Sequence, residues 1–544
     1  MDFNSLLCSL RSYWRVFLLV HLLFTLLGIT LLTPLFGGIL QGLVSLSGAA
    51  AVADQDIARL LLTPLGLVSG VFLMALFLAI AGLEIGALQS VAQAAQHSLR
   101  VTALEASGYV LRRAVSVLRL TLGLTLRVMV YLVPYVLALG AVAWLLLSEH
   151  DINYYLAQRP PEFLYALLAA GLCTLLLIWL LGRRLLGWCL IMPLVLFAGT
   201  RPEGAFRESE ALTAGNLSSC LRALASWLLV AVVLGLLPAL FLNLSTGAIV
   251  GLGIQSLDRL VLMLGFTAAL WSVLGFFVVA VNLGLLTMTI AGLYTESGGR
   301  VDVSAFDRAL RQDSQRRSPR VLGVLLGLLA PIGLLGGAAL LGDISLGDRT
   351  LIVAHRGAAG SAPENTLAAV EQALADETDW VEIDVQETRD GQVVVVHDSD
   401  FMKLSGNPLK VWDGDLAEIR EIDVGSWFDS RFAGERVPTL QEVLAAVRDR
   451  ARLVIELKYY GHDQQLEQRV VDIVESMDMA DQVAIMSLKL AGVEKLKAIR
   501  PDWPAGLLAA TAVGDLSRLD VDFLAVNQNM ANPAFIKRVH ESGK

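Results

Sequence analysis

The first 342 residues contain long apolar runs, whereas the rest of the chain alternates short apolar runs with polar and amphipathic stretches. A helix needs about 20 apolar residues to cross the hydrocarbon core of a bilayer. Seven runs of roughly this length cover residues 14–34, 61–83, 123–147, 164–182, 224–247, 260–290 and 321–342. Repetition on this scale predicts a multi-span α-helical membrane domain rather than a buried soluble core. The first run is not a cleavable signal peptide, because similar runs follow it.

Beyond residue 350 the runs become short and several are rich in β-branched residues. They cover 351–355, 381–386, 393–397, 453–458, 483–487, 505–509 and 523–527, with helical stretches at 366–375, 440–448, 464–477 and 533–541. This alternation is typical of a β/α fold. The second and third runs are separated only by residues 387–392, which contain the hairpin signal Asp390-Gly391 and are too few for a parallel crossover. We therefore expect the third run to pair antiparallel with the second, and the other six to form parallel strands.

Composition separates the same two halves. The whole chain is 55% apolar with a mean hydropathy of +0.62, which excludes a disordered chain and argues against a purely soluble protein. Residues 1–342 hold 21 Arg, no Lys and 16 acidic residues (net +5), whereas residues 343–544 hold 21 basic and 35 acidic residues (net −14). All four cysteines lie in the first half, which excludes a disulfide framework in the second. We predict a membrane domain of about seven transmembrane helices at 1–342, a linker at 343–349 and a second domain at 350–544.

The arginines of the first half indicate an orientation. The second, fourth and sixth connections between the apolar runs hold four, five and six arginines, whereas the first, third and fifth hold only Arg59, Arg159 and Arg259. Because arginine is enriched in cytoplasmic connections, this alternation places the N-terminus in the cytoplasm. Seven spans of a multi-pass plasma-membrane protein then leave residues 343–544 outside the cytoplasm.

Polar side chains gather at the ends of the predicted strands. They are His355, Arg356, Glu382, Asp384, His397, Glu456 and Lys458. Residues two apart on a strand face the same side, so Glu382 and Asp384 point together. In a β/α barrel the carboxyl ends of the strands build the active site. Carboxylates inside a barrel need a neutralising cation, and oxygen ligands without cysteine favour Mg²⁺ or Ca²⁺. Glu364 has two interpretations, a role in this site or the second half of a helix capping box with Ser361.

At these residues the sequence resembles the glycerophosphodiester phosphodiesterase family. The matching segments are AHRGAAGSAPENT (354–366), VEIDVQETRDGQVVVVHD (381–398) and IELK (455–458). The segment DVGSWFDSRFAGERVPTLQEVL (423–444) resembles the small insertion of that family, here about 399–450. The general layout, together with ESEALTAGN (208–216), resembles the subfamily in which a membrane domain is fused to this enzyme.

The resemblance implies a metal-dependent TIM-type barrel that hydrolyses a glycerophosphodiester, or a lysophospholipid-type substrate, to glycerol 3-phosphate and an alcohol. It implies one divalent cation, Mg²⁺ or Ca²⁺, bound by Glu382, Asp384 and Glu456. It also implies that His355 and His397 act as the general acid/base pair. Arg356 and Lys458 match the cations that contact the phosphate. A lipid bilayer is the other expected partner, and no nucleic acid is expected.

The family continues with two further β/α units where this chain ends, so the barrel is expected to be C-terminally incomplete. Two other functions stay open on the sequence alone. One is a transporter or channel whose outer barrel domain binds phosphodiesters without hydrolysis, and the other is an envelope interaction protein with a degenerate barrel. Two histidines beside three carboxylates favour the enzyme, because a binding protein needs no acid/base pair.

Overall fold

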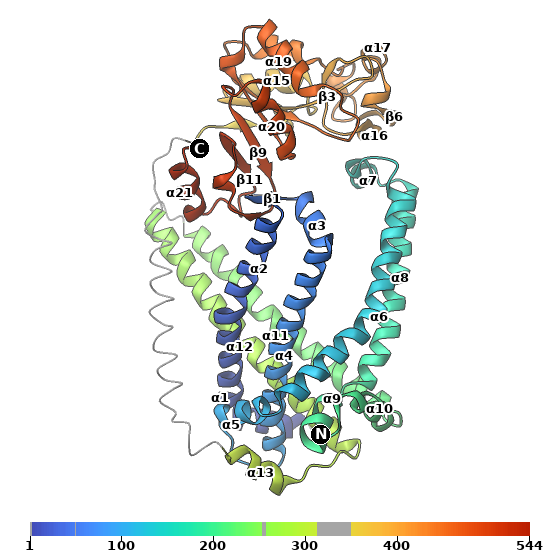
Figure 1. The fold of residues 1–544 in the computed structure, drawn as a ribbon, viewed down its shortest axis with the longest axis vertical. Coiled ribbons are helices and arrows are strands. Elements are labelled where there is room, and N and C mark those ends of the chain that lie inside the picture. The colour runs from blue at the N-terminus through green and yellow to red at the C-terminus, as the bar shows by residue number, and fades with distance from the viewer. Residues whose placement is uncertain (1–2, 49, 253–256, 313–349) are drawn as a thin grey trace. The chain divides into compact units, whose positions relative to one another are not determined.

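The structure is a computed structural model that describes residues 3–48, 50–252, 257–312 and 350–544 (Figure 1). The predicted seventh span, 321–342, lies outside the described residues. The chain groups into two compact units. The first comprises 1–38, 68–137 and 172–329, and the second comprises 39–67, 138–171 and 330–544. Two short pieces of the N-terminal half therefore belong to the same unit as the β/α half.

The N-terminal half is helical (Figure 1). Its helices are α1 (Phe3–Leu27), α2 (Thr33–Leu46), α3 (Gln55–Leu62), α4 (Pro64–Gln96), α5 (Ala103–Leu111), α6 (Ala114–Leu147), α7 (Ile152–Gln158), α8 (Pro161–Gly187), α9 (Ile191–Pro193), α10 (Pro202–Thr213), α11 (Leu217–Gly251), α12 (Leu257–Glu296) and α13 (Val303–Arg311). Within the described residues, six helical stretches are long and apolar enough to cross a membrane. They are Cys8–Leu46, Pro64–Gln96, Ala114–Leu147, Pro161–Ala198, Leu217–Ile249 and Leu262–Glu296, and each contains most or all of one predicted apolar run.

The surface of these helices is apolar over much of its area. Val130, Leu137 and Leu229 are 69%, 68% and 66% exposed, and exposed apolar surface on this scale is uncommon in a soluble monomer. Inside the first unit, α1, α4, α5 and α12 bury a core that contains Phe17 and Leu88. This pattern suggests that the helices associate with a membrane.

The β/α half contains an arc of parallel strands. In spatial order these are β11 (Phe523–Val526), β9 (Ala505–Ala509), β8 (Val483–Ser487), β7 (Arg452–Leu457), β3 (Trp380–Glu387) and β2 (Val353–Ala354). The strand β4 (Val393–Val395) pairs antiparallel with β3. The prediction of six parallel strands with one antiparallel neighbour is thus confirmed, and the arc is the TIM-like half-barrel of this part of the chain.

Alternation along β3 explains its position. Val381, Ile383 and Val385 are fully buried in the main hydrophobic core, so Glu382 and Asp384 face the opposite side. The helices α15 (Leu367–Ala375), α18 (Leu440–Val447), α19 (Leu466–Ser476), α20 (Leu490–Ile499) and α21 (Pro533–Glu541) follow strands of the arc or lie between them. The first three and the last match the predicted helical stretches to within two residues.

The segment after β4 forms a small subdomain. It contains β5 (Asp400–Phe401), α16 (Met402–Ser405), β6 (Asn407–Lys410) and α17 (Leu416–Ile419). Phe401, Val411 and Ile419 are fully buried in a separate apolar cluster. This subdomain falls inside the predicted insertion at about 399–450, whose boundaries stay a prediction.

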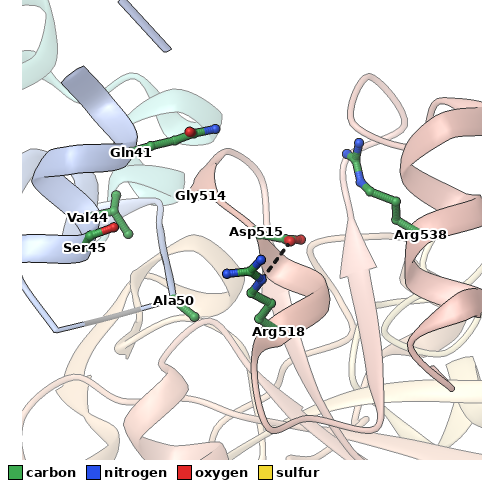
Figure 2. Close-up of a pocket in the computed structure, with 8 residues that line it drawn as sticks. All are labelled: Gln41, Val44, Ser45, Ala50, Gly514, Asp515, Arg518 and Arg538. Atoms are coloured by element: carbon green, nitrogen blue, oxygen red, sulfur yellow. Dashed lines mark ion pairs between the residues drawn. The ribbon is translucent and has the colours of Figure 1, made fainter. Parts of the chain in front are cut away.

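Two connections of the N-terminal half contact the β/α half within the second unit, and sequence patterns did not predict this. The strand β1 (Ala51–Ala53) pairs antiparallel with β10 (Ala512–Gly514). The Asp54 carboxylate accepts hydrogen bonds from the backbone N–H groups of Ala510 and Thr511 at 3.1 and 2.8 Å. A polar cavity of about 340 Å³ lies beside this pairing, with an ion pair between Asp515 and Arg518 on one wall (Figure 2). Its lining residues are Gln41, Val44, Ser45, Ala50, Gly514, Asp515, Arg518 and Arg538. The second connection contains α7, which contacts α16.

Candidate active site

Three carboxylates converge at the inner side of the arc. Glu382 and Asp384 come from β3, and Glu456 comes from β7 directly opposite Asp384 in the parallel register. Each offers one oxygen, and these oxygens lie within 4.8 Å of one another. The three residues are 3%, 0% and 4% exposed. The structure therefore brings together the three residues that the sequence predicted as metal ligands.

The electrostatics of this cluster favour a cation. Burial, followed by repulsion from Asp384, raises the pKa of Glu382 to about 8. Burial likewise raises the pKa of Glu456. Glu382 Oε1 is buried and accepts no hydrogen bond from the described residues, whereas Asp384 Oδ1 has the Lys458 ammonium at 3.3 Å. Buried carboxylate oxygens without donors are unfavourable unless positive charge approaches them, so these residues fit a divalent metal ion bound by oxygen.

Two basic residues border the cluster. Lys458 Nζ lies 2.9 Å from Glu456 Oε1 and 3.3 Å from Asp384 Oδ1. Arg356 Nε lies 3.4 Å from Asp384 Oδ2. Burial alone would lower the pKa of Lys458. The negative charges of Asp384 and Glu456 outweigh this effect, so the pKa of Lys458 is raised. For Asp384, burial is outweighed by Lys458, His397 and Arg356, so its pKa is lowered. Positive charge thus surrounds a site that an anionic phosphodiester can approach.

The loop after β2 carries Arg356 and adds His355 to the site. Arg356 adopts a left-handed backbone (φ +54°), and its N–H donates to Glu382 Oε2 at 2.7 Å. This turn brings His355 Nε2 to 4.0 Å from the same oxygen. The His355 side chain is 72% exposed. Nearby protein still limits its hydration, and this effect together with the Arg356 charge lowers its pKa.

Glu364 belongs to the site rather than to a helix cap. Thr366 caps α15 by accepting a hydrogen bond from the Ala369 N–H. Glu364 instead receives Arg356 Nη1 at 3.1 Å and Lys403 Nζ at 2.7 Å. The capping-box interpretation of Glu364 is therefore wrong, because its carboxylate has two nearby cations as stronger partners.

Asn365 is a site residue that sequence reasoning missed. Its Nδ2 donates to Asp384 Oδ2 at 2.8 Å, and its Oδ1 accepts from the Asp384 N–H at 3.2 Å. The left-handed backbone at Asn365 (φ +57°) presents the amide to the strand. The only sequence signal was its position in the SAPENT segment, which the resemblance covers.

His397 follows β4 and lies beside Asp398. Its Nδ1 is 2.6 Å from Asp398 Oδ1. Burial would raise the pKa of Asp398, but hydrogen bonding and charge from His397 hold it below its ordinary value. An ionised partner at Nδ1 favours the tautomer that carries its proton there, which leaves Nε2 free for proton transfer. Gln386 Nε2 also donates to the His397 carbonyl, which fixes the backbone.

The fold and the site first define a class. Parallel strands that carry acidic, basic and imidazole side chains at their carboxyl ends are the arrangement of a TIM-like β/α enzyme domain. The comparisons with known proteins then give the family. The model of the "Glycerophosphoryl diester phosphodiesterase family" matches residues 355–544.

Curated relatives agree with this match. The putative glycerophosphodiester phosphodiesterase YhdW of Bacillus subtilis is 37% identical over 169 residues, which are 31% of this chain and 69% of that protein. The glycerophosphodiester phosphodiesterase of Caldanaerobacter subterraneus is 36% identical over 166 residues, 29% and 67% of the two chains. The crystal structure of glycerophosphodiester phosphodiesterase from Agrobacterium tumefaciens is 30% identical, covers 36% of this chain and 84% of that chain, and has a TM-score of 0.32. The chain spans about two thirds of the length of these curated relatives. It belongs to the glycerophosphodiester phosphodiesterase family, a family of phosphoric diester hydrolases.

Proposed function

We propose that this protein is a membrane-anchored, metal-dependent hydrolase that cleaves glycerophosphodiesters to glycerol 3-phosphate and an alcohol by general acid/base catalysis. The observation that carries this proposal is the buried trio Glu382, Asp384 and Glu456, in which Glu382 Oε1 accepts no hydrogen bond from the described residues. Phosphodiester hydrolysis needs charge neutralisation, removal of a proton from the attacking oxygen and delivery of a proton to the leaving alcohol. Groups for each task lie at one face of the arc.

The carboxylate trio would hold one divalent cation, Mg²⁺ or Ca²⁺, which supplies positive charge to the phosphate oxygens when bound. Arg356 and Lys458 are proposed to contact the same phosphate. The short contacts of Lys458 with Glu456 and Asp384 keep its ammonium charged and oriented. Arg356 is similarly held by Glu364 at 3.1 Å.

His355 and His397 are proposed as the acid/base pair. The His355 side chain is exposed 4.0 Å from Glu382 Oε2, and limited hydration together with the Arg356 charge lowers its pKa. His397 is held through Nδ1 by Asp398 at 2.6 Å, which leaves its Nε2 available for proton transfer. This pair could assist attack on the phosphorus by a hydroxyl of the substrate or by water. Which histidine is the acid and which is the base has to be determined by experiment.

We also propose that the chain consists of a membrane domain (1–342), a linker (343–349) and a barrel domain (350–544). The barrel domain, which is the catalytic domain, is proposed to lie outside the cytoplasm. The arginine distribution supports this location. The contacts of the β/α half agree with this assignment. The segments that contact the β/α half, β1 and α7, lie in the first and third connections between spans. The predicted spans put both connections on the side opposite the N-terminus, and we propose that the domain bound to them shares that side.

The decisive experiment is hydrolysis of a glycerophosphodiester by the purified full chain, with release of glycerol 3-phosphate measured. Activity should disappear after treatment with EDTA and return when Mg²⁺ or Ca²⁺ is added. Glu382→Gln should show no metal-dependent turnover. Binding of the phosphodiester without any release of glycerol 3-phosphate would instead support the transporter or channel alternative.

A further inference from the structure

The third connection, residues 148–160, is anchored to the insertion subdomain inside the second unit. His150 Nδ1 lies 3.1 Å from Asp400 Oδ2, a carboxylate with no exposed surface. Lys410 Nζ donates to the Glu149 carbonyl at 2.9 Å and pairs with Asp400 at 2.6 Å. Near the other end of α7, Gln158 Nε2 donates to the Lys403 carbonyl at 3.0 Å. These contacts hold the connection on the subdomain that follows His397.

Between these anchors, Asn153 reaches the partner of His397. Asn153 Nδ2 donates to Asp398 Oδ1 at 2.8 Å, and His397 Nδ1 lies 2.6 Å from the same oxygen. Asp398 is 2% exposed, and its other oxygen is buried without a partner in the described part of the chain. The orientation of this carboxylate therefore depends on the side chains of Asn153 and His397.

The N-terminus of α7 also fixes Asn153 itself. The Asn153 N–H donates to Asp151 Oδ1 at 3.0 Å, the N-cap bond of the helix. The Tyr460 hydroxyl donates to the His397 carbonyl at 2.9 Å and lies 3.4 Å from Asp151 Oδ2. The same turn of α7 therefore lies against both the backbone and the side-chain partner of His397.

We propose that Asn153 is a positioning residue of the active site: it orients Asp398, and through Asp398 it fixes the ring of His397. Asn153 and His397 contact the same oxygen of Asp398, and two donors restrict the rotation of a carboxylate more than one does. Displacement of a catalytic group by about 1 Å can lower the rate about 100-fold. A connection between two predicted spans thus completes the catalytic site. The inference rests on the proposed acid/base role of His397.

The test compares Asn153→Ala with Gln158→Ala in the full chain. Both substitutions remove one hydrogen bond between the same connection and the β/α half, but only Asn153 touches Asp398. For Asn153→Ala we expect kcat to fall between about 10- and 100-fold with KM changed less than about twofold. Gln158→Ala should keep kcat within about twofold of the wild type. In an Asp398→Asn background, Asn153→Ala should have no further effect, since residues of one network are not additive.

A second measurement does not need turnover. Diethyl pyrocarbonate modifies a free imidazole nitrogen, and mass spectrometry quantifies the product at His397. We expect faster modification in Asn153→Ala than in Gln158→Ala. Equal kcat in the two variants, or an equal loss in both, would overturn the positioning role. If the wild type releases no glycerol 3-phosphate, the proposed function fails, while the modification rates still decide whether Asn153 orients His397.

Discussion

Replacing Glu382 by Gln should have opposite effects on the metal-free and the metal-bound protein. The pKa of Glu382 is about 8, against an ordinary value of 4.5, because burial and Asp384 oppose its charge. Between these two values the folded state holds a proton that the unfolded state has released. The metal-free folded state therefore loses stability as the pH rises from about 5 to about 8. Gln has nearly the same shape and carries no charge, so the substitution removes this loss.

The magnitude follows from the two pKa values. One pKa unit corresponds to about 1.4 kcal/mol, so the gain of Glu382→Gln over the wild type should approach roughly 4 kcal/mol at pH 8 and should vanish near pH 4.5. The metal-bound protein behaves differently, because its bound cation holds Glu382 ionised. In Glu382→Gln the affinity for Mg²⁺ or Ca²⁺ should fall at least about tenfold.

Scanning calorimetry of the full chain in EDTA, at several pH values, measures the thermal transition of the β/α half. Isothermal titration with Mg²⁺ and with Ca²⁺ measures the affinity. Glu387→Gln is a matched control on the same strand, since Glu387 is 8% exposed and pairs with Arg469 at 2.9 Å. It should lower the transition temperature and leave metal affinity unchanged. A transition of Glu382→Gln at pH 8 no higher than that of the wild type would refute the electrostatic reasoning, and wild-type metal affinity would refute the ligand assignment.

Three further predictions concern topology, catalysis and folding. Cysteine introduced as Ser405→Cys, at the exposed last residue of α16, should react with an impermeant reagent on intact cells, because residues 350–544 are proposed to lie outside. His355→Ala and His397→Ala should each lower turnover about 10²–10⁴-fold, and only the variant of the general acid should recover on a nitrophenyl substrate, whose leaving group needs little protonation. Asp423 accepts bonds from the N–H groups of Ser426, Gly434 and Gly425, which lower its pKa. Its stabilisation is present above pH 4 and is lost as the pH falls below that. Because solvent screens this carboxylate, Asp423→Asn should remove this acid sensitivity and only about 1 kcal/mol of stability at pH 7.

A specific outcome would contradict each of these three predictions. Labelling of Ser405→Cys only after lysis would imply an even number of spans. Equal losses for both histidine variants on both substrates would show that the division into acid and base is wrong, and losses of only a few-fold would contradict the enzyme itself. A wild-type loss of stability between pH 4 and pH 2 that Asp423→Asn retains would exclude this carboxylate as its source. The thermal transition of the β/α half, followed between pH 2 and pH 7, provides that last comparison.

Much of the arc and its carboxylate cluster could be predicted because the signals are local. The buried faces of β3 and β7 alternate with their polar residues, so Glu382 and Asp384 fall on one side by period alone. The short Asp390-Gly391 connection likewise determines that β4 runs antiparallel to β3. Glu364 shows where local patterns fail. Its spacing from Ser361 is that of a capping box, but the insertion subdomain brings Lys403 to 2.7 Å and the tertiary partner prevails.

The contacts of the two connections were unpredictable for a different reason. Asn153 and Asp398 are 245 positions apart, and Asp54 and Thr511 are 457 apart. Polar residues in short connections have no hydrophobic period that could reveal which surface they meet.

There is nevertheless a physical reason why these contacts form where they do. The strand β10 pairs with β1, and without β1 that edge of β10 would be unpaired, which is unfavourable or prone to association. Residues 51–53 supply the pairing that β10 needs, and residues 149–158 supply the second donor that Asp398 needs. Both pieces lie in connections with a single arginine, which the charge distribution predicts to be on one side of the membrane. The β/α half therefore obtains a strand partner and a hydrogen bond to Asp398 from connections that the proposed topology assigns to its own compartment.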